Sequence, residues 1–311
     1  MSRPLRWDVE GLDWPHREAS SFIAVGGLRW HVQRMGKGPV LLLVHGTGAS
    51  SHTWRDLLPA FAPDFSCVAI DLPGHAFTAA PPSAMLSLQG MARLLATLLR
   101  SLHLSPAMIV GHSAGAAIAV QLCLHEGISP DALVSINGAF LPLSGVAGLV
   151  FPPAAKVMAR NSLASRLFAW RASDRSVVRQ LIHGTGSRLD ARGEDLYARL
   201  VRNPLHVAAA LGMMARWDVA PVVDSLPRLR TRLQLIAGTE DHAVPPAQSH
   251  RVHRAVPNSA VAMVAHAGHL VHEEKPDQVV ALIRRFWREG PEGRIGQAGQ
   301  GAIANCLASL R

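Results

Sequence analysis

Short, uninterrupted apolar runs recur along the chain and alternate with segments whose apolar residues fall at three- and four-residue spacing. The runs cover residues 39–44, 66–70, 107–110, 132–136, 233–237 and 260–264. Such runs are typical of strands buried on both faces of a sheet. The spaced segments have the period of amphipathic helices and cover residues 53–62, 88–102, 114–125, 246–255 and 276–287. The alternation predicts an α/β fold with a mostly parallel sheet and helices on both faces.

The chain begins with a different pattern. Residues 21–25 and 28–33 have the composition of strands, and Gly26-Gly27 lies between them. Two glycines between two such runs are a signal for a tight hairpin turn. We therefore expect an antiparallel pair of strands before the parallel part of the sheet.

A helix-like, arginine-rich segment without a clear strand interrupts the alternation after the run at residues 132–136. A chain of 311 residues suits one large domain with an insertion better than two independent domains. We expect residues 1–138 and 218–288 to form the two parts of one core. Residues 139–217 are expected to form an inserted helical lid, and the turn-rich residues 289–311 a mobile tail.

Composition and charge narrow the class of protein. Apolar residues make up 49% of the chain and charged residues 17%, which is typical of a globular protein. Much of the net charge of +9 lies between Leu141 and Trp217, where basic side chains outnumber acidic ones by seven. This excess would attract anionic ligands or surfaces, although solvated arginines on amphipathic helices explain it equally well. The aromatic residues of this segment do not alternate regularly with the basic ones as base stacking would require, so nucleic acid is not an expected partner.

Residues 132–155 carry no charged side chain and are long enough to cross a bilayer. They also contain several glycines and prolines, which favours a buried strand followed by an apolar part of the lid. Contact of residues 141–151 with a membrane surface remains the alternative. The first ten residues contain no apolar stretch of signal-peptide length, so we expect a cytoplasmic protein.

The most specific chemical signal is Gly111-His112-Ser113-Ala114-Gly115, which lies between an expected strand and an expected helix. A serine at such a strained turn presents its hydroxyl outward, and glycines two residues away on each side leave room for the chain to reverse. Ser113 is therefore the candidate nucleophile.

A serine hydroxyl needs a base and a group that orients that base. Asp241 follows the run at residues 233–237, and His269 follows the run at residues 260–264. The carboxyl ends of parallel strands meet at one edge of a sheet, so Ser113, Asp241 and His269 are expected to form a catalytic triad. Glu240 is the rival for the acidic member.

Acyl transfer also requires donors for the developing oxyanion. His45-Gly46-Thr47-Gly48 follows the run at residues 39–44, and we assign the backbone amides of Thr47 and Ala114 as these donors. The same tetrapeptide recurs at residues 183–186 within the lid. There we expect a helix stop, with Ser187 capping a new helix that carries Asp190 three residues later.

Several other side chains have a functional and a packing interpretation. His112, Phe140 and Trp170 are candidate substrate contacts and equally candidate packing residues. His266, His269 and His272 have a spacing that suggests a metal site, but Gly268 argues against one continuous helix and no cysteine or carboxylate completes a ligand set. Cys67, Cys123 and Cys306 are widely spaced, as expected of reduced thiols. No metal or cofactor is expected.

The motifs quoted above, together with Asp71-Leu72-Pro73-Gly74-His75 and Glu273-Glu274-Lys275-Pro276, jointly resemble the α/β-hydrolase superfamily over about residues 20–288. The resemblance implies the α/β-hydrolase fold and a serine hydrolase. Ala76 stands where many members have glycine, which affects one local turn.

A closer resemblance is carried by Trp14-Pro15-His16-Arg17-Glu18 and by residues 27–33, 184–190 and 213–218. These segments are similar to the magnesium-chelatase-associated α/β-hydrolase proteins of photosynthetic bacteria. That resemblance implies a role in bacteriochlorophyll biosynthesis linked to magnesium insertion into protoporphyrin IX. Two hypotheses follow: a serine hydrolase that cleaves an ester or acyl bond of a hydrophobic substrate such as a tetrapyrrole, and a non-catalytic accessory protein that binds porphyrin for the chelatase subunits.

Overall fold

The computed structural model describes residues 3–141, 167, 169–171 and 174–290. Within these residues, one sheet has the strand order β1-β2-β4-β3-β5-β6-β7-β8. The strands are β1 (Ser20–Val25), β2 (Leu28–Met35), β3 (Val40–Val44), β4 (Ser66–Ile70), β5 (Pro106–His112), β6 (Ala132–Ile136), β7 (Arg232–Gly238) and β8 (Ser259–Val264). Each predicted apolar run is a strand of this sheet.

The sheet is antiparallel at its beginning and parallel in the rest. β1 and β2 form the expected hairpin around Gly26 and Gly27, and β2 pairs antiparallel with β4. From β4 to β8 every neighbouring pair is parallel. The predicted α/β class with a mostly parallel sheet is confirmed.

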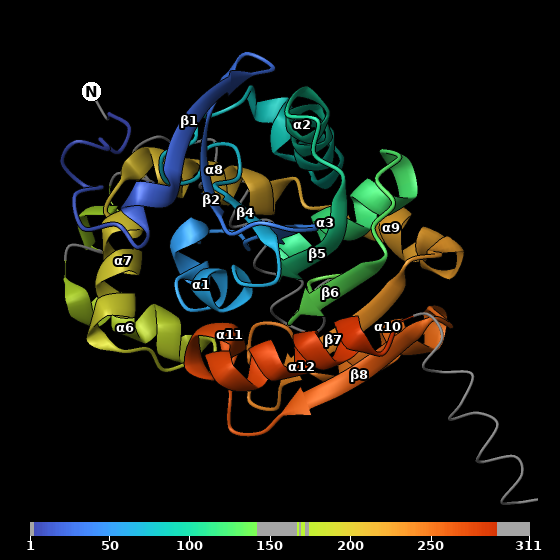
Figure 1. Cartoon of the computed structure of the whole chain (residues 1–311). Helices are drawn as coiled ribbons and strands as arrows, with labels where there is room; N and C mark the ends of the chain where they lie inside the picture. Colours follow the sequence, from blue (N-terminus) through green and yellow to red (C-terminus); the bar gives the residue numbers. More distant parts are fainter. Residues whose placement is uncertain (1–2, 142–166, 168, 172–173, 291–311) are drawn as a thin grey trace, which may run out of the picture.

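Helices cover both faces of the sheet (Figure 1). Leu42 and Val44 of β3 belong to the core shared with α2 (Leu88–Ser101) and α3 (Ala114–His125), whereas Leu41 and Leu43 belong to the core shared with α1 (Leu57–Phe61) and α12 (Pro276–Arg288). Successive side chains of a strand point to opposite faces, which is why one apolar run feeds two cores. The shorter α9 (Ala220–Ser225), α10 (Ala247–Ala255) and α11 (Val271–Glu274) complete the core helices.

One expected helix is divided. Instead of a continuous helix over residues 53–62, the chain forms the 3-10 turn η2 (Ser51–Trp54) and then α1. Pro59 explains the late start, because proline lacks the amide that a helix interior requires and is tolerated in a first turn. Three other 3-10 turns lie at Arg17–Ala19 (η1), Ser83–Leu86 (η3) and Leu226–Arg228 (η4).

The described residues between β6 and β7 include α6 (Arg175–Gly184), α7 (Ala191–Val201) and α8 (Pro204–Ala215). Figure 1 shows α6 and α7 at one side of the sheet, near the end of α11. Residues 142–166, which include most of the candidate membrane contact, lie outside the described residues, as do residues 291–311 of the expected tail. No helix in the described part is both long and apolar enough to span a membrane.

The end of α6 confirms one expectation and corrects another. The helix stops at Gly184, as predicted for the second His-Gly-Thr-Gly segment. Ser187, however, does not cap the next helix. Asp190 is the N-cap of α7, and its side chain accepts the amide of Gly193 at 2.7 Å. The hydroxyl of Ser187 is used elsewhere, because it accepts a hydrogen bond from the amide of Leu270.

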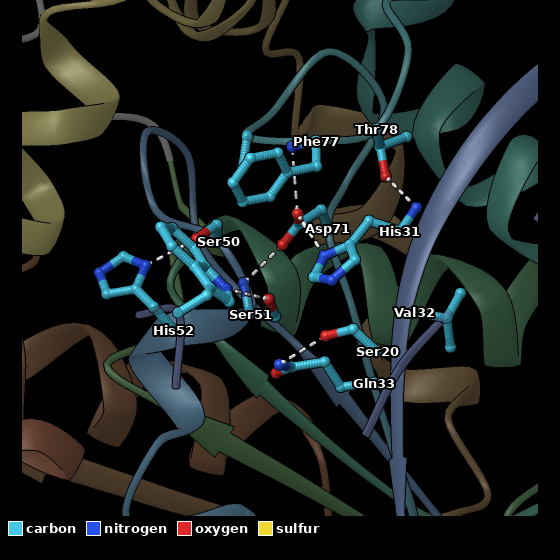
Figure 2. A network of polar contacts seen from close by, with 12 residues as sticks. Ser20, His31, Val32, Gln33, Ser50, Ser51, His52, Asp71, Phe77 and Thr78 are labelled. Atoms are coloured by element: carbon cyan, nitrogen blue, oxygen red, sulfur yellow. Dashed lines mark hydrogen bonds and ion pairs between the residues drawn. The ribbon is translucent and has the colours of Figure 1, made fainter. Parts of the chain in front are cut away.

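Asp71, just after β4, ties together the loops that follow β3 and β4 (Figure 2). Its Oδ1 accepts the amide of Ser51 at 2.7 Å, and its Oδ2 accepts the amide of Phe77 at 3.2 Å and lies 2.7 Å from Nδ1 of His31. Burial opposes ionisation, but His31 and the Ser51 amide hold the pKa of Asp71 below its usual range. This buried network therefore helps to hold in place the loop after β3, which also carries Thr47, the candidate oxyanion donor.

Candidate active site

Ser113 lies at a strained turn between β5 and α3. Its φ is 51°, a left-handed value that L residues rarely adopt, and its amide donates to the carbonyl of Ile136 at 2.9 Å. A Cβ on Gly111 would collide with the backbone of Ala116, and a Cβ on Gly115 would collide with the carbonyl of Val44. The two glycines of the motif are thus required by close backbone approach.

His269 and Asp241 are brought together by the loops that follow β8 and β7. Nδ1 of His269 lies 2.8 Å from Oδ2 of Asp241, whose side chain is fully buried. Oδ1 of Asp241 accepts the amides of Ala243 and Val244, each at 2.8 Å. Glu240 faces elsewhere, because its carboxylate lies 3.2 Å from exposed His266. The structure therefore brings Asp241, and not Glu240, to His269.

Asn137, at the end of β6, holds the histidine loop in place. Its Nδ2 donates to the carbonyls of His269 at 2.7 Å and Gly268 at 2.9 Å, and its Oδ1 accepts the amide of Gly238 at 2.9 Å. Its φ of 46° is one that asparagine tolerates better than most residues. Sequence reasoning missed this residue, although an asparagine followed by glycine at the carboxyl end of a parallel strand is a usable signal.

The candidate oxyanion loop passes directly against the elbow. A Cβ on Gly46 would lie 2.9 Å from Cβ of Ser113, so the chain there approaches the serine as closely as glycine permits. Thr47 follows Gly46, and Ala114 opens α3, where the first amides of a helix have no partner within the helix. Nε2 of His45 accepts the amide of Leu72 at 2.9 Å and so fixes the start of this loop.

The chain matches a known protein family over most of its length. The sequence pattern of the alpha/beta hydrolase fold matches residues 39–276. The chain belongs to the α/β-hydrolase fold family. It is also similar to a protein from Rhodobacter capsulatus named "Magnesium-chelatase 30 kDa subunit", which is 38% identical over 280 residues, covering 89% of this chain and 97% of that protein.

Two solved structures support the same fold. An α/β-hydrolase fold protein from Burkholderia ambifaria has a TM-score of 0.73 at 23% identity and covers 91% of this chain and 99% of its own. The epoxide hydrolase CorEH has a TM-score of 0.74 at 19% identity and covers 86% of this chain and 98% of its own. At this level of identity, the likeness concerns the fold alone.

The three residues that the sequence suggested as substrate contacts, His112, Phe140 and Trp170, differ in exposure. His112 is 2% exposed, and its Nε2 donates to the carbonyl of His269 at 2.9 Å, while burial holds its pKa well below the usual value. Phe140 is 1% exposed and belongs to the core beside α3. Trp170, by contrast, is 68% exposed. Burial favours the packing role for His112 and Phe140.

His206 of α8, which the sequence did not single out, contacts the candidate oxyanion loop. Its Nε2 donates to the carbonyl of Gly48 at 3.1 Å, and its Nδ1 accepts the amide of Ala76 at 3.0 Å. Burial lowers the pKa of His206 to about 4, so the ring is neutral and able to accept. Ala76 has a left-handed φ of 42°, a value that glycine adopts more easily than alanine.

A buried carboxylate, Glu273 of α11, links α7 to the loop that follows β3. It accepts Thr53 Oγ1 at 2.6 Å and the Tyr197 hydroxyl at 2.8 Å on one oxygen, and pairs with Arg55 Nη1 at 2.6 Å on the other. Burial raises its pKa to about 7, although Arg55 and the two hydroxyls oppose the shift. Arg55 also reaches Asp190, the cap of α7, at 3.3 Å.

Several arginines of α6 and α7 have acidic partners, which reduces the charge available to a ligand. Arg175 pairs with Asp195 at 2.8 Å, Arg179 with Glu194 at 3.0 Å, and Arg199 with Asp13 at 2.6 Å. Arg160 and Arg166 lie outside the described residues. A cleft of about 1050 Å³ lies at the opposite edge of the sheet from Ser113, near the start of β7, and is not part of this site.

Within the described residues, no group of three or more histidine, cysteine or acidic side chains is arranged to hold a metal ion. The three histidines with suggestive spacing have separate partners: His266 contacts Glu240, His269 contacts Asp241, and His272 lies 2.7 Å from the hydroxyl of Thr53. Cys67 and Cys123 are free thiols, and Cys306 lies outside the described residues.

Proposed function

We propose that this protein is a serine hydrolase in which Ser113 is the nucleophile, His269 the base and Asp241 the orienting acid. The observation that carries the proposal is the 2.8 Å pairing of His269 with buried Asp241, on loops beside the elbow that bears Ser113. A buried carboxylate of this kind fixes the tautomer of the imidazole and leaves Nε2 free to accept a proton.

The reaction then proceeds in two steps. His269 Nε2 takes the proton of the Ser113 hydroxyl as Oγ attacks the acyl carbon, and it returns that proton to the departing alcohol. The amides of Thr47 and Ala114 stabilise the charge that develops on the carbonyl oxygen. Water, deprotonated by His269, next attacks the acyl-serine, and the acid product leaves as Ser113 regains its proton.

For the substrate, we propose an ester or related acyl bond of a hydrophobic molecule in bacteriochlorophyll biosynthesis, a tetrapyrrole being the leading class. The name of the Rhodobacter capsulatus relative, which refers to magnesium chelatase, supports this assignment and makes chelatase subunits the proposed partners. Exposed Trp170 is the proposed apolar contact. Residues 139–217 are proposed as the lid that covers the substrate.

The second candidate is an accessory protein that binds porphyrin without cleaving it. The name of the relative and the basic lid favour this role, because porphyrin propionates are anionic and the macrocycle is apolar. The ion pairs of Arg175, Arg179 and Arg199 weaken the electrostatic part of that argument.

A hydrolysis assay with the matched variant Ser113→Ala tests the proposal. The substrates are p-nitrophenyl esters of increasing acyl length and protoporphyrin IX dimethyl ester, with and without magnesium. We expect wild-type turnover that Ser113→Ala abolishes, while porphyrin binding followed by fluorescence is retained. Saturable porphyrin binding with no turnover of any ester by the wild type would instead favour the accessory role.

A further inference from the structure

The turn between α6 and α7 packs onto the loops that carry the candidate acid and base. The carbonyl of Thr185 accepts two amides, those of His242 and His269, each at 3.2 Å. His242 is the neighbour of Asp241, so one carbonyl of this turn bridges both loops. These bonds arise from the second His-Gly-Thr-Gly segment, which the proposed chemistry does not use directly.

Ser187 makes a second attachment two residues later. Its Oγ accepts the amide of Leu270 at 2.8 Å, and the residue is fully buried. A buried amide without a partner is costly, so this hydroxyl fixes the backbone immediately after His269. Both amides on the two sides of the His269 carbonyl are thereby held by one turn.

Two glycines allow the close approach that these bonds need. Gly186 has a φ of +83°, and a Cβ there would collide with the carbonyl of Glu240. A Cβ on Gly268 would lie 2.5 Å from the carbonyl oxygen of Gly186. The carboxylate of Glu274 then closes the junction, because it accepts the amides of Gly268 at 3.0 Å and Arg188 at 3.2 Å.

The backbone of His269 is thus held from three sides. Asn137 and His112 donate to its carbonyl from the core, Thr185 accepts its amide, and Ser187 accepts the amide of Leu270. The imidazole of His269 is also held by Asp241 through Nδ1. A shift of the His269 backbone would therefore lengthen or break the hydrogen bond between His269 and Asp241. Catalytic geometry tolerates little displacement, and an error of about 1 Å can cost about 100-fold in rate.

We propose that Ser187 is a positioning residue for His269. Through the hydroxyl of Ser187, the turn at residues 185–188 holds the imidazole of His269 within hydrogen-bonding distance of Asp241. This assignment rests on the proposed serine hydrolase function. It assigns to the inserted segment a direct part in assembling the triad, besides any part in covering the substrate.

The test is Ser187→Ala in the full-length protein, with Ser187→Thr as the variant that keeps a hydroxyl. For Ser187→Ala we expect kcat on p-nitrophenyl butyrate and the rate of fluorophosphonate labelling to fall about 10-fold to 100-fold. KM should stay within about twofold, because the proposed role of Ser187 is to position the base and not to bind substrate, and Ser187→Thr should restore most of the rate. The downfield proton resonance of the His269–Asp241 hydrogen bond should broaden in Ser187→Ala and return in Ser187→Thr.

The matched control is Ser259→Ala at the opposite end of β8, which also removes a buried, hydrogen-bonded hydroxyl. If Ser259→Ala lowers kcat as much as Ser187→Ala, or if Ser187→Ala changes neither the rate nor the resonance, the proposal is overturned. Should Ser187→Ala fail to fold, Ser187→Cys keeps the volume with a weaker acceptor and is expected to show a smaller loss of the same kind. If the wild type is inert toward esters and fluorophosphonates, the serine hydrolase assignment fails, and the proton resonance alone judges the role of Ser187.

Discussion

Oδ2 of Asp241 lies 2.8 Å from Nδ1 of His269, while Oδ1 of the same carboxylate accepts two amides of its own loop. The amides of residues 243 and 244 therefore hold the carboxylate in place, and the carboxylate in turn orients the imidazole of His269. The buried side chain of Asp241 thus links the loop after β7 to the imidazole of His269, the candidate base.

Replacing Asp241 with asparagine should leave the fold intact but lower kcat about 1,000-fold to 10,000-fold. The amide nitrogen that replaces Oδ2 donates a hydrogen bond to Nδ1, which favours the imidazole tautomer whose Nε2 carries the proton and cannot act as a base. The measurement is steady-state ester hydrolysis. Glu240→Gln is the matched control and should change kcat less than twofold, since Glu240 pairs with exposed His266. Equal losses in the two variants would contradict the assignment.

Replacing Asn137 with alanine should destabilise the protein by about 2–3 kcal/mol, because three backbone groups each lose one hydrogen bond, and only the carbonyl of His269 keeps a bond from His112. Urea unfolding measures this loss. We also expect a lower kcat, since the carbonyl of His269 is freed on one side. A variant with wild-type stability and rate would show that the amide is dispensable.

The Glu273 network predicts graded effects on stability. Tyr197→Phe removes one hydrogen bond to the carboxylate and should cost about 1 kcal/mol, whereas Glu273→Ala removes the closest acidic partner of partly buried Arg55 and should cost about 3 kcal/mol. Urea unfolding distinguishes the two. Glu289→Gln, which breaks the exposed pair with Arg285, is expected to change stability by less than about 0.5 kcal/mol. A similar cost for all three would contradict this account.

Buried neutral histidines predict acid sensitivity. Burial lowers the pKa of six of them, with His206 at about 4 and His272 at about 3; the others are His45, His52, His75 and His112. Histidines of the unfolded chain have pKa values near 6.5, so between pH 6.5 and the lowered pKa values the unfolded chain binds more protons than the folded chain. The free energy of unfolding therefore falls as the pH drops below about 6.5. For His206 and His272, the slope approaches about 1.4 kcal/mol per pH unit between the folded and unfolded pKa values.

Urea unfolding at pH 7, 6 and 5 measures this dependence. His206→Gln should flatten the curve by the share of one histidine, because the pKa of this ring is lowered to about 4 in the folded protein. A free energy of unfolding that is constant from pH 7 to pH 5 would contradict the neutral, buried state of these rings.

The strands and the elbow could be predicted from the sequence because local signals specify them. Buried parallel strands are uninterrupted apolar runs, and Gly111 and Gly115 bracket Ser113 at the spacing that a tight turn needs. The pairing of Asp241 with His269 could be predicted as well, because both follow parallel strands and chain order places their loops at one edge.

The supporting contacts could not be predicted, because they depend on tertiary neighbours. Asn137 binds a carbonyl 132 residues away, and His206 binds one 158 residues away. Ser187 illustrates the difficulty most clearly. A capping serine and a serine that receives a distant amide both accept from a backbone N–H, so the local pattern cannot tell the two uses apart, and the partner of Ser187 lies 83 residues away.

Covalent labelling of the purified protein with a fluorophosphonate, with the modified residue located by mass spectrometry, tests the central claim most directly. The account predicts stoichiometric modification of Ser113 in the wild type, no labelling of Ser113→Ala, and a rate at least about 1,000-fold lower in His269→Ala. An unlabelled wild type, or labelling of Ser113 at the same rate with and without His269, would contradict it.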